Sequence, residues 1–406
     1  MVIVVFVVVA IFISITDNAY AEPLSWLQCE KTKIVNSQGE RVRLRGVNLG
    51  SWLVQETWML PFKTTPSKKG KFSEIRDHTM LWNTLERRFG YEKMHQLRLA
   101  FRKSWITEKD FAQIRAMGFN CVRLPFLYDM IDEPEGLFFW LDTALEYARK
   151  HGLYVILDMH GAPGRQSSGQ HTGEINHDRF FSDPTYWTQA GKLWGKIAER
   201  YKDCPEIAGF DLLNEPKGAP SNAILYKAQH ELYRRLRRYD KRHIIFVEDG
   251  YKSIKYMPKP DTYGWKNTAL STHIFSFEEL SEDAFQKNLI RRLDTIADAY
   301  RLRKMPYFLG EFNVKPYGTF TMIRRFVSQL HQRGLSYCFW SYKIAHRGGG
   351  HLLWGLYSSD KHTKSIDPFK DSHKEILKKI QALTTDRLAA NRPLIELFQS
   401  HLASTS

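Results

Sequence analysis

Residues 207–218 read IAGFDLLNEPKG, a mostly apolar run that ends on Asn214, Glu215 and Pro216. The run has the length of a β-strand, and its apolar character on both faces is typical of a strand buried between helices in a parallel sheet. Proline then fixes the backbone where the chain leaves the strand. A lone carboxylate at the end of a buried strand is therefore a candidate for chemistry.

Seven further runs of this kind alternate with longer helical stretches. They cover residues 43–48, 119–126, 153–160, 243–249, 269–275, 307–312 and 335–342. In the helical stretch TEKDFAQIRAMG, Thr107 can cap the first turn, Asp110 suits its positive end and Gly118 ends the helix. Other helices are expected to begin near Trp140, Pro184, Pro220, Ser281 and Thr319. Eight strands alternating with helices predict an α/β fold, a single-domain (β/α)8 TIM barrel.

The predicted barrel domain covers residues 22–385, and no Gly-, Ser- or Pro-rich linker divides it. The stretch KIVNSQGERVRL precedes the first strand, and we interpret it as an N-terminal hairpin that covers the barrel floor. Residues 386–406 are expected to form a C-terminal helix or a loose tail.

The first 21 residues have the pattern of a signal peptide. Residues 2–13 are apolar without a break, and Ala19, Tyr20 and Ala21 form a small-x-small cleavage pattern. The sequence therefore predicts secretion to the extracellular space or the periplasm. An uncleaved membrane anchor is the alternative, although spanning a bilayer takes about 20 apolar residues.

The chain of 406 residues has a formal charge of +15, with 59 basic and 44 acidic residues. The basic residues are spread along helical stretches such as ELYRRLRRYDKRH, which favours solvated helix faces over a nucleic-acid site. Contact with an anionic cell-envelope surface remains open. We expect no nucleic-acid partner and a monomer.

Four widely spaced cysteines indicate neither a zinc site nor a disulfide scaffold. Cys121 and Cys338 lie in strand-like runs and are expected in the core. Cys29 and Cys204 could form a bridge near the barrel floor.

In a barrel of this type the active site lies at the carboxyl ends of the strands. Glu215 stands at the end of the fourth predicted strand and Glu311 at the end of the seventh, so both would reach the same mouth. Glycosidic cleavage requires two such groups, an acid that protonates the leaving oxygen and a carboxylate that meets positive charge at the anomeric carbon. One Glu alone would favour a helix cap or an arginine partner, but two at matching strand ends favour catalysis.

Other strand ends add polar and aromatic side chains to this mouth. Arg123 would keep a carboxylate ionised, and Trp340 would pack on a sugar ring.

A metal site is the rival interpretation, with possible ligands at His160, His171, His177, His273, His346 and His351. It is disfavoured because the first predicted strand, RLRGVN, lacks the His-x-His expected of a barrel metallohydrolase.

Six motifs occur in order over roughly residues 40–360: RLRGVNLGSWLVQETWM, WITEKDFAQIRAMGFNCVRLPF, LDMHGAPGRQ, LLNEP, GEF and FWSYK. Together they resemble glycoside hydrolase family 5, the cellulase family, and within it the exo-β-1,3-glucanase-like branch. The resemblance implies a retaining double displacement on a β-glucan, with Glu215 as the acid/base and Glu311 as the nucleophile. It implies neither a metal nor an organic cofactor. It also implies substrate-site roles for Asn214, which would bind the sugar 2-hydroxyl, for Arg123, which would steady the nucleophile, and for His160, His273 and Trp340.

One position departs from the family pattern. The family usually has His-x-Tyr on strand six, whereas this chain has His273, Ile274 and Phe275. The missing hydroxyl would remove a hydrogen bond to the nucleophile, and Tyr342 is a candidate replacement donor. A catalytically weak carbohydrate-binding homologue is therefore a second hypothesis.

The favoured substrate is β-1,3-glucan, because the resemblance is strongest in the first half of the chain. The short connection after Glu311 leaves an open cleft, which keeps an endo-β-1,4-glucanase or mannanase activity as an alternative. Long exit loops at residues 49–106, 161–183 and 343–362 would supply the walls of the substrate site. The candidate wall residues are Trp52, Trp58, His171 and Trp354.

Overall fold

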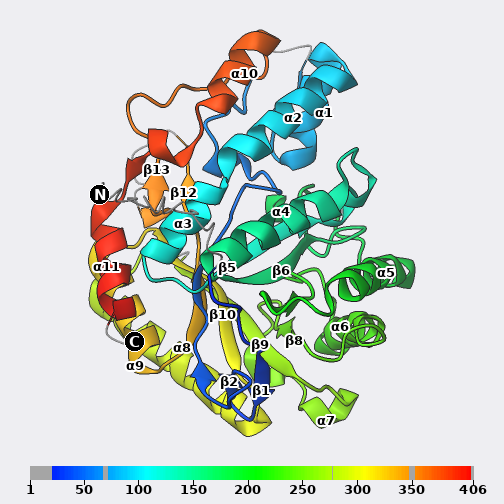
Figure 1. Ribbon diagram of the computed structural model, residues 1–406, viewed down its shortest axis with the longest axis vertical. Coiled ribbons are helices and arrows are strands. Elements are labelled where there is room, and N and C mark those ends of the chain that lie inside the picture. The colour runs from blue at the N-terminus through cyan, green and yellow to red at the C-terminus, as the bar shows by residue number, and fades with distance from the viewer. Residues whose placement is uncertain (1–20, 67–71, 277, 347–352, 404–406) are drawn as a thin grey trace, which may run out of the picture.

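The computed structural model describes residues 21–66, 72–276, 278–346 and 353–403. Eight parallel strands close into a barrel in the order β10-β11-β4-β5-β6-β7-β8-β9 (Figure 1). Their bounds are β4 (Arg45–Asn48), β5 (Cys121–Leu127), β6 (Tyr154–Gly161), β7 (Ile207–Asp211), β8 (Ile244–Glu248), β9 (Thr268–Ser276), β10 (Tyr307–Pro316) and β11 (Ser336–Phe339). Each overlaps one of the eight predicted runs, so the prediction of a TIM barrel is confirmed. The predicted signal peptide lies outside the described residues, apart from Ala21.

Helices surround the barrel. They are α1 (His78–Phe89), α2 (Tyr91–Trp105), α3 (Glu108–Ala116), α4 (Gly136–His151), α5 (Pro184–Tyr201), α6 (Asn222–Leu236), α7 (Pro260–Tyr263), α8 (Glu282–Arg303), α9 (Phe320–Gln332), α10 (His373–Gln381) and α11 (Arg392–Ala403). The start of α3 matches the prediction, since Thr107 and Asp110 form a capping box, and Gly118 follows the helix with φ of +92°. By contrast, α4 begins four residues before Trp140.

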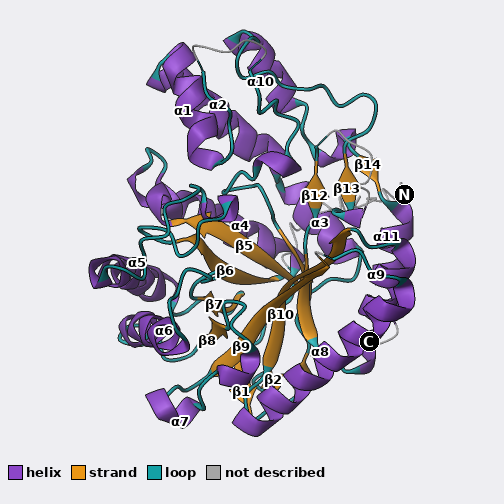
Figure 2. Cartoon of the chain, turned by 180° about the vertical axis from the view of Figure 1, so that it is seen from behind, coloured by secondary structure: helices purple, strands orange, loops and turns teal. Residues whose placement is uncertain are grey.

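Two connections differ from a simple alternation of strands and helices. The first exit segment, expected as a long loop over residues 49–106, contains the paired helices α1 and α2, and α10 packs against α2. These three helices lie at the opposite end of the molecule from β1 and β2 (Figures 1 and 2). Between β8 and β9 the regular helix is a single turn, α7, bounded by Pro260 and Gly264, because proline and glycine interrupt a longer helix there.

The predicted hairpin at the barrel floor is confirmed. Strands β1 (Gln28–Glu30), β2 (Lys33–Val35) and β3 (Arg41–Val42) form an antiparallel sheet. Leu27 and Ile34 pack on residues at the start of the barrel strands, including Leu44 and Phe308. This apolar plug closes the floor and leaves the opposite end of the barrel for the site.

The cysteines do not form the bridge considered above. All four are free thiols, and the Sγ atoms of Cys121 and Cys338 lie 3.8 Å apart inside the floor cluster. Cys29 lies in β1, where its backbone N donates to Asn267, and Cys204 follows α5.

The last described residues form helix α11, which packs against residues of the barrel. In α11, the Phe398 ring lies 5.3 Å from Phe119 and 5.1 Å from Phe339, measured between ring centroids. A small sheet of β12 (Lys343–Ile344), β13 (Tyr357–Ser358) and β14 (Ala389–Ala390) precedes it. Within the part of the chain that the structure describes, no helix is both long and apolar enough to cross a bilayer.

Candidate active site

A cavity of about 600 Å³ opens at the carboxyl ends of the barrel strands. Eight of the predicted site residues line it: His160, His171, Asn214, Glu215, Glu311, Trp340, Trp58 and Trp354. The long loop between β6 and α5 contributes residues 167–171, and the chain that follows β4 contributes Glu56 and Trp58. Residues far apart in the sequence are thus brought together at one mouth.

Glu215 and Glu311 face each other across this mouth. An oxygen of each carboxylate and a nitrogen of His273 all lie within 4.8 Å of one another. The backbone of Glu215 has φ of +42°, and its N–H donates to Glu248 Oε2 at 2.8 Å. A Cβ atom at Gly310 would lie 2.7 Å from His273 Nε2, so only glycine fits beside Glu311.

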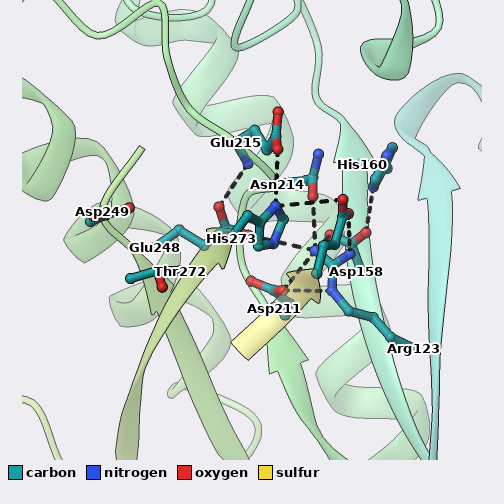
Figure 3. A network of polar contacts seen from close by, with 12 residues as sticks. Arg123, Asp158, His160, Asp211, Asn214, Glu215, Glu248, Asp249, Thr272 and His273 are labelled. Carbon is teal, nitrogen blue, oxygen red and sulfur yellow. Dashed lines mark hydrogen bonds and ion pairs between the residues drawn. The ribbon is translucent and has the colours of Figure 1, made fainter. Parts of the chain in front are cut away.

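Arg123 binds Glu311 and the polar side chains next to it. Its guanidinium donates to Glu311 Oε1 at 2.7 Å and to Asn214 Oδ1 at 2.8 Å. It also donates to Asp211 Oδ2 at 2.9 Å and lies 3.0 Å from Asp158 (Figure 3). Burial disfavours its charge, but the surrounding carboxylates outweigh burial and raise its pKa. Arg123 is therefore a fixed cation beneath the carboxylate pair.

His273 lies between the two glutamates. Its Nδ1 is 3.0 Å from Glu215 Oε1 and 3.6 Å from Glu311 Oε2, and its Nε2 is 3.2 Å from Glu248 Oε1 (Figure 3). Burial lowers its pKa, but the Glu248 and Glu311 charges and hydrogen bonds to Glu215 and Glu248 raise it overall, well above the usual value. A doubly protonated imidazole donates hydrogen bonds and has no lone pair for a metal. The Glu215, His273 and Glu311 cluster, although compact enough for an ion, thus fits a proton network better.

The two glutamates have opposite electrostatic settings. Burial raises the pKa of Glu311 to about 8, against the charges of His273 and Arg123. Burial also acts on Glu215, but the hydrogen bond from His273 and the charges of His273 and Lys217 lower its pKa well below the usual value. The donors around Glu215 favour its ionised form, so Glu215 must gain a proton before it can act as an acid.

The remaining predicted residues are placed to contact a ligand. The ring of His160 stacks on Trp340, with centroids 5.7 Å apart, and its Nδ1 lies 2.6 Å from Asp158 Oδ2. The Nδ2 atom of Asn214 is buried and has no hydrogen-bond partner among the described residues. Because a buried amide without a partner is costly, Asn214 is poised to donate to a bound molecule.

Two predicted roles are wrong. Trp52 is not a wall of the site: its ring is fully buried, and its Nε1 donates to the backbone oxygen of Arg102, so it belongs to the core. Tyr342 does not replace the missing hydroxyl, because its own hydroxyl bonds to Asp110 and Gln113. Phe275 lines the cavity and packs near Trp354.

The histidines of the metal hypothesis do not converge. His160, His171 and His273 lie at the mouth, but His177 pairs with Glu174 on the outer loop and His346 lines a different cavity. His351 lies outside the described residues. The described histidines therefore do not assemble the metal site considered as the rival.

Several functional side chains were not predicted. Asp158, Asp211 and Glu248 form the acidic lining around Arg123, and Lys217 and Tyr251 contact Glu215. Glu56 also lines the cavity, accepts from Trp58 Nε1 at 2.9 Å and has its pKa raised by burial to about 7. Charged residues inside otherwise apolar strands are the signal that points to the first three.

Comparisons with known proteins agree with this geometry. The family model described as Cellulase (glycosyl hydrolase family 5) matches residues 82–346. A β-xylosidase of Phanerodontia chrysosporium is 29% identical over 71% of this chain and 62% of its own length. A probable glucan 1,3-β-glucosidase A of Aspergillus fumigatus is 31% identical over 52% of this chain and 50% of its own length. This chain thus spans between half and two thirds of the length of these two relatives.

Solved structures with the same fold have lower identity. The rutinosidase from Aspergillus niger matches with a TM-score of 0.60 and 17% identity, covering 74% of this chain and 90% of that one. An endogalactoceramidase matches with a TM-score of 0.58 and 16% identity, covering 88% and 85%. At such identities the likeness concerns the fold.

Proposed function

The chain belongs to glycosyl hydrolase family 5, and on that premise we propose that it is a retaining β-glucan hydrolase with β-1,3-glucan as its favoured substrate. One observation carries the proposal: an oxygen of Glu215 and an oxygen of Glu311 lie within 4.8 Å of each other at the mouth of the barrel. Retaining enzymes hold their carboxyl groups about 5–5.5 Å apart, because one of them must reach the anomeric carbon itself. The relative from Aspergillus fumigatus, which is named as a probable glucan 1,3-β-glucosidase, supports the substrate class.

In the first step, Glu311 attacks the anomeric carbon while Glu215 protonates the departing oxygen, which gives a glycosyl ester on Glu311. Arg123 stabilises the ionised form of Glu311 that attacks. In the second step, Glu215 takes a proton from water, the water oxygen bonds to the anomeric carbon, and the ester breaks. Because one group protonates and then deprotonates, Glu215 must change its protonation state in each cycle.

The aromatic rings of the cavity suit a pyranose. Trp58 and Trp354 lie 4.6 Å apart between ring centroids, and Trp340, which also lines the cavity, stacks on His160. Apolar sugar faces pack on such rings, while Asn214 Nδ2 is placed to donate to a sugar hydroxyl. These contacts would hold the anomeric carbon beside Glu311.

Secretion, a monomeric state and contact with an anionic envelope belong to the same proposal. The apolar segment at residues 2–13 and the formal charge of +15 support it. Tagged protein expressed from the full sequence should be recovered outside the cell, with its N-terminus at Glu22 and the size of a monomer.

A time course of products on laminarin, carboxymethylcellulose and mannan tests the function. Glucose alone from laminarin supports exo-acting β-1,3 cleavage, whereas a ladder of oligosaccharides supports endo action. Products only from carboxymethylcellulose or mannan would favour the alternative substrates. Binding without products from any polymer would favour the carbohydrate-binding homologue.

Replacing Phe275 with Tyr is expected to raise kcat on the preferred glucan. The family hydroxyl would donate to the nucleophile, and a hydrogen bond to a charged group is worth about 1.5–3 kcal/mol, or roughly tenfold to a hundredfold in rate. Comparing kcat for Phe275→Tyr, Phe275→Leu and the unmodified protein measures the effect. A Tyr variant no faster than the unmodified protein would mean that the site has adapted to the lost hydroxyl.

A further inference from the structure

Glu215 has more donors than a general acid needs. The hydroxyl of Tyr251 donates to Oε1 at 2.7 Å, His273 Nδ1 lies 3.0 Å from the same oxygen, and Lys217 Nζ lies 2.9 Å from Oε2. The ammonium of Lys217 also lies 4.3 Å from the centre of the Tyr251 ring, which holds it beside the carboxylate. Both oxygens therefore contact donors, two of which are cations, and such a setting opposes a protonated acid.

The titratable groups around Glu215 come from several barrel strands and from the loops that follow them. Lys217 follows β7, Tyr251 follows β8, His273 is on β9, and His171, with its Nε2 at 3.7 Å, is on the loop after β6. The carboxyl groups near Glu215 are Glu248 on β8, whose Oε2 accepts from the Glu215 backbone N–H, together with Glu311 on β10, Asp158 on β6 and Glu56 after β4.

These neighbours are not equally replaceable. Burial lowers the pKa of His171 to about 4, so its ring is neutral near neutral pH. His273 is buried and tied to Glu248 and Glu311 as well as to Glu215. The side chain of Lys217 is 43% exposed and contacts neither Glu248 nor Glu311 among the ion pairs of the described residues. It is therefore the cation that a bound leaving group can contact, and its substitution should disturb the buried network least.

Resting on the proposed function, we propose that Lys217 influences leaving-group specificity: it raises the activity on β-glucosides of phenols or carboxylic acids relative to the activity on glucosides of alcohols and sugars. A phenolate or carboxylate departs without a proton from the enzyme. An ammonium beside the departing oxygen stabilises its developing charge, and a Glu215 already ionised is ready to act as the base of the next step. Glucan cleavage, which needs protonated Glu215, is expected to decline at lower pH than cleavage of aryl glucosides.

The bond changes balance without a further reactant. Glu311 bonds to the anomeric carbon, the carbon–oxygen bond to the aglycone breaks, and its electron pair departs on the phenolate or carboxylate oxygen. Water then gives its proton to Glu215 and its oxygen to the anomeric carbon, and the ester on Glu311 breaks. The proton returns from Glu215 to solvent or to the released anion.

The test measures kcat/KM for dinitrophenyl, nitrophenyl, phenyl and methyl β-glucosides and for laminaribiose across pH. Lys217→Met should lower the ratio of dinitrophenyl glucoside to laminaribiose activity by at least about tenfold, because positioned acid catalysis is worth about 10²–10⁴-fold. It should also move the alkaline limb for laminaribiose to higher pH. Lys217→Arg should keep the unmodified ratio, and so should Lys192→Met, which removes the same charge from the exposed face of α5.

The outcomes separate the two proposals. An unchanged ratio in Lys217→Met, or an equal loss on every substrate, overturns the role of Lys217 while the hydrolase function stands. If the unmodified protein cleaves no glucoside, dinitrophenyl glucoside included, the proposed function fails and the role of Lys217 fails with it.

Discussion

Glu311→Gln is expected to reduce hydrolysis of the preferred glucan by at least about 10³-fold, because an amide cannot attack the anomeric carbon and form the ester. The substitution changes one atom of the side chain, and the amide oxygen can still accept from Arg123, which is 2.7 Å from Glu311 Oε1. The fold and substrate binding should therefore persist. Initial rates of glucose release and a dissociation constant for laminari-oligosaccharides measure the two effects separately.

Two further measurements locate the chemistry. A 2-deoxy-2-fluoroglucoside with a good leaving group should label the unmodified protein on the peptide that contains Glu311, and it should not label Glu311→Gln. Glu199→Gln, which makes the same change on the exposed surface of α5, should retain full activity and labelling. Activity that survives in Glu311→Gln but is abolished by EDTA would instead revive the metal hypothesis.

The barrel could be predicted because its strands carry a strong local signal. Runs such as those at 153–160 and 307–312 are apolar on both faces, and their polar residues come at the end where the active site of a barrel lies. The same rule predicts that Glu215 and Glu311 share one mouth, and in the structure an oxygen of each lies within 4.8 Å of the other. Six ordered motifs indicated the family, and the match over residues 82–346 confirms it.

Contacts between strands could not be predicted in this way. Asp158 and Asp211 lie inside runs that look apolar, and their partner Arg123 comes from a third strand, so only the closed barrel brings them within 3.0 Å of it. Trp52 and Trp58 are six residues apart on one exit segment, yet one is in the core and the other lines the cavity. The direction of a loop side chain depends on packing against distant elements, which a local pattern does not contain.

The donors to Glu215 illustrate the same limit. Tyr251 follows β8 and Lys217 follows β7, so their convergence depends on the positions of two neighbouring strand ends. The sequence indicates that a hydroxyl is missing at Phe275, but it does not indicate that Tyr251 places a hydroxyl on the other glutamate. The balance of acid strength between Glu215 and Glu311 therefore becomes visible only in three dimensions.

Arg123→Met is expected to lower the free energy of unfolding by about 3–5 kcal/mol near neutral pH, because it leaves several buried carboxylates without their cation. Asp158, Asp211 and Glu311 all contact Arg123, and all four side chains are nearly or fully buried. Arg200→Met is the matched control, since its pair with Asp142 is about half exposed and such pairs contribute about 0–1 kcal/mol. Urea unfolding of both variants measures the difference.

The pH dependence of this loss distinguishes missing charge from missing volume. Burial already raises the pKa of Asp158 to about 7 and those of Asp211 and Glu311 to about 8, so the folded protein binds more protons than the unfolded chain between about pH 4 and 8. Raised carboxyl pKa values make stability fall as pH increases through that window, and removing Arg123 raises them further. The deficit of Arg123→Met should thus be smallest below about pH 6, where these carboxyls are protonated in both folded proteins, and should grow as pH rises toward 8, where the unmodified protein ionises them more than the variant does. A deficit that is constant with pH would mean that packing of the Arg123 side chain, rather than its charge, holds the four residues together.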